Sequence, residues 1–235
     1  AGGNNVNDLS PLANLTKLEK LGLWENEIND LSPIQDLTNL RWLNLDENDI
    51  SDLTPLEGMK QLEELRLNEN RIENIDPVAN LENLKEIVLE FNHISDLSPL
   101  RNLTNLNMVD LEQNEVTNIK PLLDNPGIDR GDHLDLKRNC LYLKDGSEDE
   151  RDIEDLKSRG VKVDIVGDQK PPISNFNASD GESGQSILKW TNPDTTDLIE
   201  VSLRRKIGGY PVSHTDGAKV TCSQGSIDAE PGAEN

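Results

Sequence analysis

Five asparagines spaced 22 residues apart organise the first half of the chain. They are Asn26, Asn48, Asn70, Asn92 and Asn114. Aliphatic residues stand three, five and eight positions before each of them, and Ile or Val stands two positions after. A repeated unit of this size cannot bury its apolar face alone, so such units stack against one another. The period therefore predicts a solenoid.

This spacing is typical of a leucine-rich repeat, whose period is about 20–29 residues. We expect an α/β repeat solenoid shaped as a horseshoe, with parallel strands on the concave face and short turns on the convex face. A chain with only 34% hydrophobic residues can fold in this way because each buried aliphatic side chain contributes roughly 1.5–3 kcal/mol. The asparagines are expected to bond backbone groups of neighbouring turns, and losing one is expected to cost about 1–3 kcal/mol.

A proline recurs at the same place in each repeat, and Ser, Thr or Asp stands immediately before five of these six prolines. Such a residue can cap a helical turn, and proline already has the required φ angle. We therefore expect a short 3₁₀ or helical turn to start at each proline. The six are Pro11, Pro33, Pro55, Pro77, Pro99 and Pro121.

We expect three regions: leucine-rich repeats over residues 1–141, a C-terminal cap over 142–169, and a β-rich domain with a polar tail over 170–235. In the cap, Ser147 and Glu150 have the spacing of a capping box, and Gly160 is placed to end the helix before a strand.

The last region begins near Pro171-Pro172 and contains β-rich segments at residues 173–178, 186–190 and 200–205, which is sandwich-like patterning. These are too few for a complete sandwich of about seven strands. Because Asn4-Asn5-Val6 already matches the end of a repeat, we expect the chain to be a fragment.

The acidity of the chain excludes two classes of partner. Net charge is −22, and residues 1–170 alone hold 18 basic and 36 acidic residues. Such a surface repels nucleic acid and anionic lipid, which are recognised by clustered Lys and Arg. No apolar run in the given sequence approaches the roughly 18 residues of a membrane span.

No cofactor, metal site or catalytic centre is expected. His93, His133 and His214 fall in separate parts of the repeat scheme, and the acidic segment from Asp145 lacks the glycine and glutamate of an EF-hand loop. The two cysteines, Cys140 and Cys222, fall in different expected domains, so the sequence does not predict a disulfide framework. Cys140 stands at a position that is polar in earlier repeats, so an accessible side chain is expected there.

The sequence of the repeats resembles that of the repeats in bacterial internalins. Asp30-Leu31-Ser32-Pro33 recurs as Asp96-Leu97-Ser98-Pro99, and Asn14-Leu15-Thr16 recurs as Asn102-Leu103-Thr104. Leu188-Lys189-Trp190-Thr191-Asn192-Pro193 resembles a strand of a fibronectin type III domain. The internalin resemblance implies a secreted or surface-attached bacterial protein that holds another protein on its concave face.

Candidate binding residues follow from strand geometry. With the leucines pointing inward, the residues between them point outward onto the concave face. Trp24 and Trp42 lie on adjacent expected strands and could form one aromatic patch, although single exposed apolar residues are also ordinary. The carboxylates could attract a basic partner, or could simply be solvated. The candidates are Trp24, Trp42, Asp46, Glu64, Arg66, Glu86, Glu90, Phe91, Asp110 and Glu112.

These features predict a non-enzymatic, extracellular or bacterial cell-surface adhesion module that is monomeric and recognises a protein ligand. Two alternatives remain open from the sequence. One is an intracellular scaffold that tethers an enzyme such as a phosphatase, and the other is the targeting module of an enzyme whose catalytic domain lies outside this fragment.

Overall fold

A computed structural model describes residues 2–165, 177–180, 185–191 and 198–204. The chain divides into two compact units, Ala1–Gln169 and Lys170–Asn235, and each is described by itself. No helix in the described parts is long and apolar enough to cross a membrane.

The first unit is built on one sheet of seven parallel strands in the order β1-β2-β3-β4-β5-β6-β7. The strands pair in register, so that Lys20, Trp42, Glu64, Glu86, Met108, His133 and Lys162 form one row across the sheet. This confirms the predicted leucine-rich repeat solenoid. The strands are β1 (Lys20–Gly22), β2 (Trp42–Asn44), β3 (Glu64–Arg66), β4 (Glu86–Val88), β5 (Met108–Asp110), β6 (His133–Asp135) and β7 (Lys162–Asp164).

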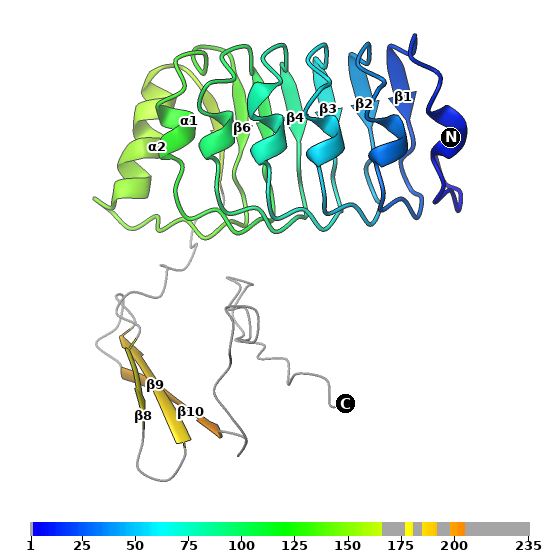
Figure 1. The fold of residues 1–235 in the computed structure, drawn as a ribbon. Helices are drawn as coiled ribbons and strands as arrows, with labels where there is room; N and C mark the ends of the chain where they lie inside the picture. Colours follow the sequence, from blue (N-terminus) through cyan, green and yellow to red (C-terminus); the bar gives the residue numbers. More distant parts are fainter. Residues whose placement is uncertain (1, 166–176, 181–184, 192–197, 205–235) are drawn as a thin grey trace. The chain divides into compact units, whose positions relative to one another are not determined.

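Short helical turns stack on the side of the unit opposite the strands (Figure 1). Proline stands at the start of each turn, as expected from its preset φ angle. The turns are η1 (Ser10–Leu12), η2 (Ser32–Ile34), η3 (Thr54–Leu56), η4 (Asp76–Asn80), η5 (Ser98–Leu100) and α1 (Lys120–Leu123).

The turns are capped differently from the sequence prediction. Ser32 does not cap η2 with its side chain. Instead, Asp30 Oδ1 accepts a hydrogen bond from the Ser32 backbone N–H at 2.8 Å, an Asx-type turn. Asp8 and Asp52 make the same contact at η1 and η3. Hydrogen bonds from the Ser32 side chain and backbone lower the pKa of Asp30. At these turns the aspartate two residues before the Ser or Thr backbone N–H therefore makes the capping contact.

The five periodic asparagines and Asn139, called the ladder asparagines from here on, bond neighbouring backbone groups as the period predicts. Asn48 Nδ2 donates to the carbonyls of Leu23 and Leu45 at 3.0 Å, and its Oδ1 accepts from the Ile28 backbone N–H at 3.0 Å. Asn70 repeats this pattern one turn further along the solenoid. Around them the leucine positions merge into one continuous core, in which most side chains are fully buried. Each asparagine therefore joins two repeats by satisfying buried backbone groups.

One residue per repeat, immediately before the ladder asparagine, has a left-handed backbone. None of these six residues is glycine, and their φ angles lie between 50° and 55°. Such a conformation costs of order 1–3 kcal/mol for residues with a Cβ and persists only where the surroundings impose it. They are Glu25, Glu47, Glu69, Phe91, Gln113 and Arg138.

A helix and a strand close the C-terminal end of the sheet, as predicted. Ser147 is the N-cap of α2 (Glu148–Ser158), and its Oγ accepts a hydrogen bond from the Glu150 backbone N–H at 3.2 Å. Gly160 follows with φ +93°, and β7 then pairs with β6. The prediction of an accessible Cys140 is wrong: the residue is only 3% exposed, and its sulfur is in a disulfide bond.

In the second unit, the described residues form a three-stranded antiparallel sheet of β8 (Asn177–Asp180), β9 (Gln185–Thr191) and β10 (Leu198–Arg204), in the order β10-β9-β8. The rest of the region expected to resemble a fibronectin type III domain, including the polar tail, lies outside the described residues. Three strands do not establish that fold.

Candidate functional site

The side chains of the seven strands alternate between the core and the concave face. In β2, Leu43 is fully buried, whereas Trp42 and Asn44 on either side are half-buried. The same alternation occurs in β3 and β5. The structure therefore places the predicted candidates on or beside one surface. Trp42, Glu64, Arg66, Glu86 and Asp110 lie within strands, while Trp24, Asp46, Glu90, Phe91 and Glu112 follow the strand ends.

Two predicted outward positions are more buried than expected. Val88 is 2% exposed and Asp135 is 8% exposed. Val88 lies in register between Arg66 of β3 and Asp110 of β5. The carboxylate of Asp135 binds the ammonium group of Lys137.

The two tryptophans predicted to form a patch do come together. A Cβ atom placed on Gly22 would lie 2.5 Å from Trp24 Cζ3 and 3.2 Å from Trp42 Cζ3, so both indole rings lie over this glycine. They line an open hollow of about 250 Å³ together with Asn44, Asp46 and Glu47. We call this the tryptophan hollow. Phe91 is not among its lining residues, so the third aromatic candidate is separate from the pair.

Arg66 of β3 pairs with two carboxylates of the concave face. Its Nη1 lies 3.1 Å from Glu86 Oε1, and its Nε lies 3.4 Å from Asp46 Oδ2. Burial and the neighbouring Glu64 nevertheless raise the pKa of Glu86. One guanidinium therefore holds two of the predicted acidic candidates.

A second acidic group follows on β4 to β6. Burial and then the charge of Asp110 raise the pKa of Glu90, and burial raises the pKa of Asp110 itself. Lys137 partly offsets this charge, because its ammonium lies 3.4 Å from Glu112 Oε2 and also binds Asp135. Carboxylates still outnumber this lysine, so this part of the face favours an added positive charge.

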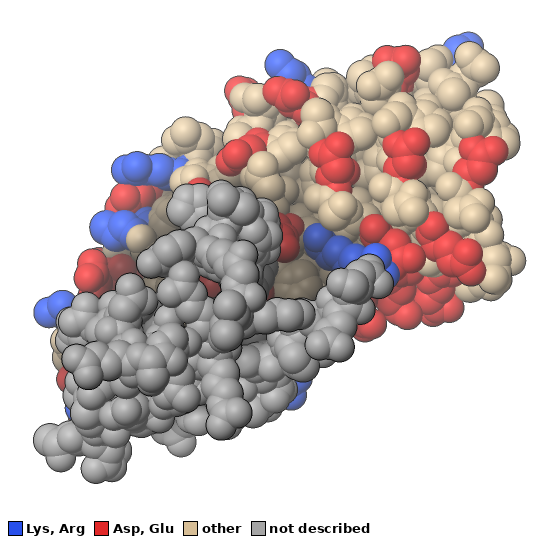
Figure 2. Space-filling view, turned by 60° about the horizontal axis from the view of Figure 1, so that its bottom comes forward, with Lys and Arg blue, Asp and Glu red and all other residues tan. Residues whose placement is uncertain are grey.

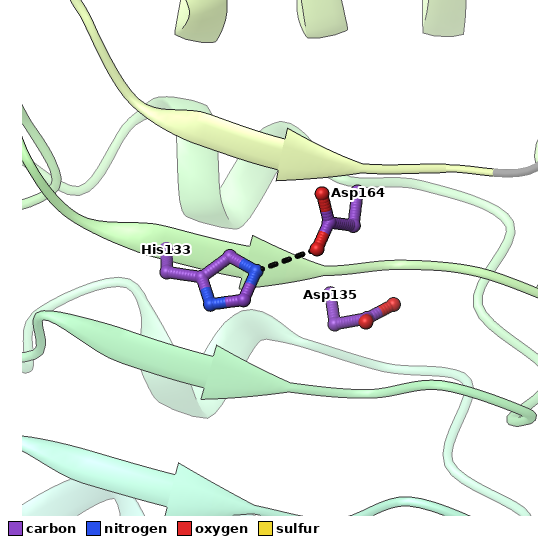
Figure 3. A group of neighbouring side chains, drawn as sticks. All are labelled: His133, Asp135 and Asp164. Carbon is purple, nitrogen blue, oxygen red and sulfur yellow. Dashed lines mark hydrogen bonds and ion pairs between the residues drawn. The ribbon is translucent and has the colours of Figure 1, made fainter.

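A group of possible metal ligands, not anticipated from the sequence, lies at the C-terminal end of the sheet (Figure 3). Single ligand atoms of His133, Asp135 and Asp164 lie within 4.8 Å of one another. His133 Nε2 is 2.8 Å from Asp164 Oδ2. The sequence could have indicated Asp164, because a cap strand that continues the sheet places it in register with Asp135.

Two lysines already bind the carboxylates of this group. Lys162 Nζ lies 2.9 Å from Asp164 Oδ2 and 3.1 Å from His133 Nε2, and Lys137 binds Asp135. Hydrogen bonds from Lys162 and His133 lower the pKa of Asp164. A metal ion would have to displace these ammonium groups, so the arrangement is best described as a network of ion pairs. His93 is paired separately with Glu115, and His214 lies outside the described residues.

Figure 2 shows one face of the molecule, on which single acidic side chains recur from repeat to repeat and others gather in a dense group. Lys and Arg are fewer on this face. The distribution agrees with the excess of acidic residues in residues 1–170.

Comparisons with known proteins agree with the fold. A family described as "Leucine Rich repeats (2 copies)" matches residues 38–80, and no curated protein sequence matches significantly. Among solved structures, an internalin from Listeria monocytogenes is 32% identical over 69% of this chain, with a TM-score of 0.61. The chain spans 47% of that internalin.

Two further solved structures are similar to the chain. A leucine-rich repeat protein from Leptospira interrogans, 23% identical over 65% of this chain and 38% of its own length, has a TM-score of 0.56 and shows the fold alone. Internalin C2 from Listeria monocytogenes is 31% identical, and the match covers 70% of each chain with a TM-score of 0.59. The shared repeats, sheet and identity show that the chain belongs to the internalin family of leucine-rich repeat proteins.

Proposed function

We propose that the repeats form a protein-recognition module of a secreted or cell-surface bacterial protein, and that the module binds a partner protein on its concave face. The observation that carries this proposal is the tryptophan hollow. Trp24 is 39% exposed, although the core is supplied by aliphatic residues and has no need of it. Exposed tryptophans are enriched among the residues that dominate the binding energy of interfaces.

The backbone of this surface supports the same conclusion. The seven strands are held in one register by the asparagine ladder, so the side chains of the face are presented by a rigid scaffold. Stacked repeats generally create extended concave surfaces of this kind for binding. A rigid surface loses little conformational entropy when a partner binds.

The concave face is open, which favours binding over catalysis. The carboxyl groups with raised pKa values, Glu86, Glu90 and Asp110, lie on the open sheet surface. The tryptophan hollow is likewise open and small beside a typical ligand pocket of about 300–1,000 Å³. We therefore propose a non-enzymatic module.

The test is capture of surface proteins from cell extracts by the full chain, compared with the variant Trp24→Ala/Trp42→Ala. We expect one or more proteins to be captured by the full chain and lost from the variant. Leu15→Ala is the matched control, because Leu15 is the other large apolar residue in the described part that is strongly exposed, at 47%, and it belongs to the turn that follows η1. A partner retained by the tryptophan variant but lost from the Leu15 variant would contradict the concave site.

The surface location is tested separately. Antibodies against the chain would be used to follow its digestion by protease added to intact source cells, or its appearance in the medium. Protection until the cells are lysed would instead favour the intracellular scaffold.

A further inference from the structure

We propose that the tryptophan hollow is a binding site for an arginine side chain, presented by the partner protein. The inference rests on the proposed function and specifies the chemistry of the contact. Its basis is the combination of two indole rings with carboxylates on the rim of one hollow, lined by Trp24, Trp42, Asn44, Asp46 and Glu47.

The aromatic surface depends on Gly22. Because a Cβ atom there would lie only 2.5 Å from the Trp24 ring and 3.2 Å from the Trp42 ring, any larger residue would push the rings away. Trp42 lies in register with Lys20 of β1, and Gly22 with Asn44 of β2. Two adjacent repeats therefore supply the rings, and the glycine between them lets both lie against the sheet.

Of the two carboxylates on the rim of the hollow, Asp46 is already paired with Arg66, so the unbalanced negative charge belongs to Glu47. Glu47 is one of the six residues with a left-handed backbone, and Glu25 and Glu69 hold the same position one repeat away on either side. Among the described residues, none of these three glutamates takes part in an ion pair. Burial and the charges of Glu69, Glu25 and Asp46 raise the pKa of Glu47, which indicates that the local field disfavours further negative charge and favours a cation.

The cation best matched to this combination is a guanidinium group. Its flat face stacks on an indole ring, and its five N–H groups can at the same time donate to carboxylates at the rim. A lysine ammonium is a compact, strongly hydrated charge that lacks the flat face. A quaternary ammonium has no N–H to donate, so it leaves the rim carboxylates unused. An apolar side chain would use the rings and leave the carboxylates without a partner.

The contact can be measured in the full chain without knowing the partner. The probe is N-acetyl-arginine methylamide, with the lysine and leucine analogues as comparisons. Binding is followed by NMR through the indole N–H signals of the three tryptophans, which are assigned with Trp→Phe variants. Trp190 lies outside the repeats and serves as an internal reference.

We expect the arginine analogue to shift the Trp24 and Trp42 signals and to leave Trp190 unchanged. The lysine analogue is expected to bind about threefold more weakly, and the leucine analogue weaker still. Glu47→Gln is expected to weaken arginine binding by a factor of about three. Glu57→Gln is the matched control, because Glu57 is an exposed glutamate at the end of η3 on the convex side, and it is expected to change nothing.

Three results would overturn the inference: stronger binding of the leucine analogue, equal binding of lysine and arginine, or equal effects of Glu47→Gln and Glu57→Gln. Absence of any shift would overturn it as well. If protein capture by the full chain still depended on the two tryptophans in those cases, the proposed function would stand and only the arginine assignment would fail.

Discussion

Replacing Asn70 by alanine tests whether the asparagine ladder holds the repeats together. Asn70 is 7% exposed. Its Nδ2 donates to the carbonyls of Leu45 and Leu67 at 3.0 and 3.2 Å, and its Oδ1 accepts from the Ile50 N–H at 2.9 Å. Alanine would leave the buried Ile50 N–H without its acceptor, whereas the carbonyls of Leu45 and Leu67 keep Asn48 and Asn92 as donors. Because an unpaired buried N–H costs about 1–3 kcal/mol, we expect Asn70→Ala to lower the free energy of unfolding by that amount.

Asn26 provides the comparison, because it makes related bonds at the first described repeat, where it is only half-buried. Water can reach the groups that it leaves, so Asn26→Ala is expected to cost only about 1 kcal/mol. Both variants would be unfolded in urea and followed by circular dichroism, and their free energies compared only if the dependence on urea is unchanged. Equal losses for Asn26→Ala and Asn70→Ala, or a loss below about 1 kcal/mol for Asn70→Ala, would refute the reasoning.

Three further predictions concern single positions. Asp110→Asn should stabilise the fold at pH 7 by roughly 0.5 kcal/mol. Burial raises the folded-state pKa of Asp110 above its ordinary value, so the ionised carboxylate destabilises the fold at neutral pH. In urea titrations at several pH values, the gain in unfolding free energy should therefore vanish as the pH falls from that raised pKa to the ordinary value. Ser147→Ala removes the N-cap of α2 and should cost about 1 kcal/mol, seen as faster hydrogen exchange in α2 with protection in β3 unchanged. Gly22→Ala should displace the Trp24 ring, given the 2.5 Å contact, and thereby reduce capture of the partner while the circular dichroism spectrum stays the same.

The sequence predicts the scaffold well because one pattern fixes many positions at once. A leucine at a core position such as Leu43 or Leu65 is fully buried, and the side chains beside it point outward, as the alternation of a strand requires. The asparagine bonds follow from the same period. The role of Asp30 was missed because Ser32 before the proline offered an equally plausible cap, and only the bond geometry separates the two.

The details of the concave face were less predictable. The convergence of Trp24 and Trp42 depends on ring orientation over Gly22, which the period does not encode. Strand alternation predicts an outward, exposed Val88, whereas the residue is only 2% exposed. Asp164 joins His133 only because the cap strand continues the sheet in register.

Because the strands keep one parallel register, the distance between two sites on the concave face is set by the number of repeats between them. Neighbouring strands lie about 4.7–4.9 Å apart, so each repeat advances the surface by one fixed step. The tryptophan hollow belongs to β1 and β2, and the ion-pair network of His133 to β6 and β7. Inserting or deleting one whole 22-residue unit between them would change their separation by one step and leave each internally intact. A chain of this design can therefore be fitted to a longer or shorter partner by changing the number of repeats, without redesigning any contact.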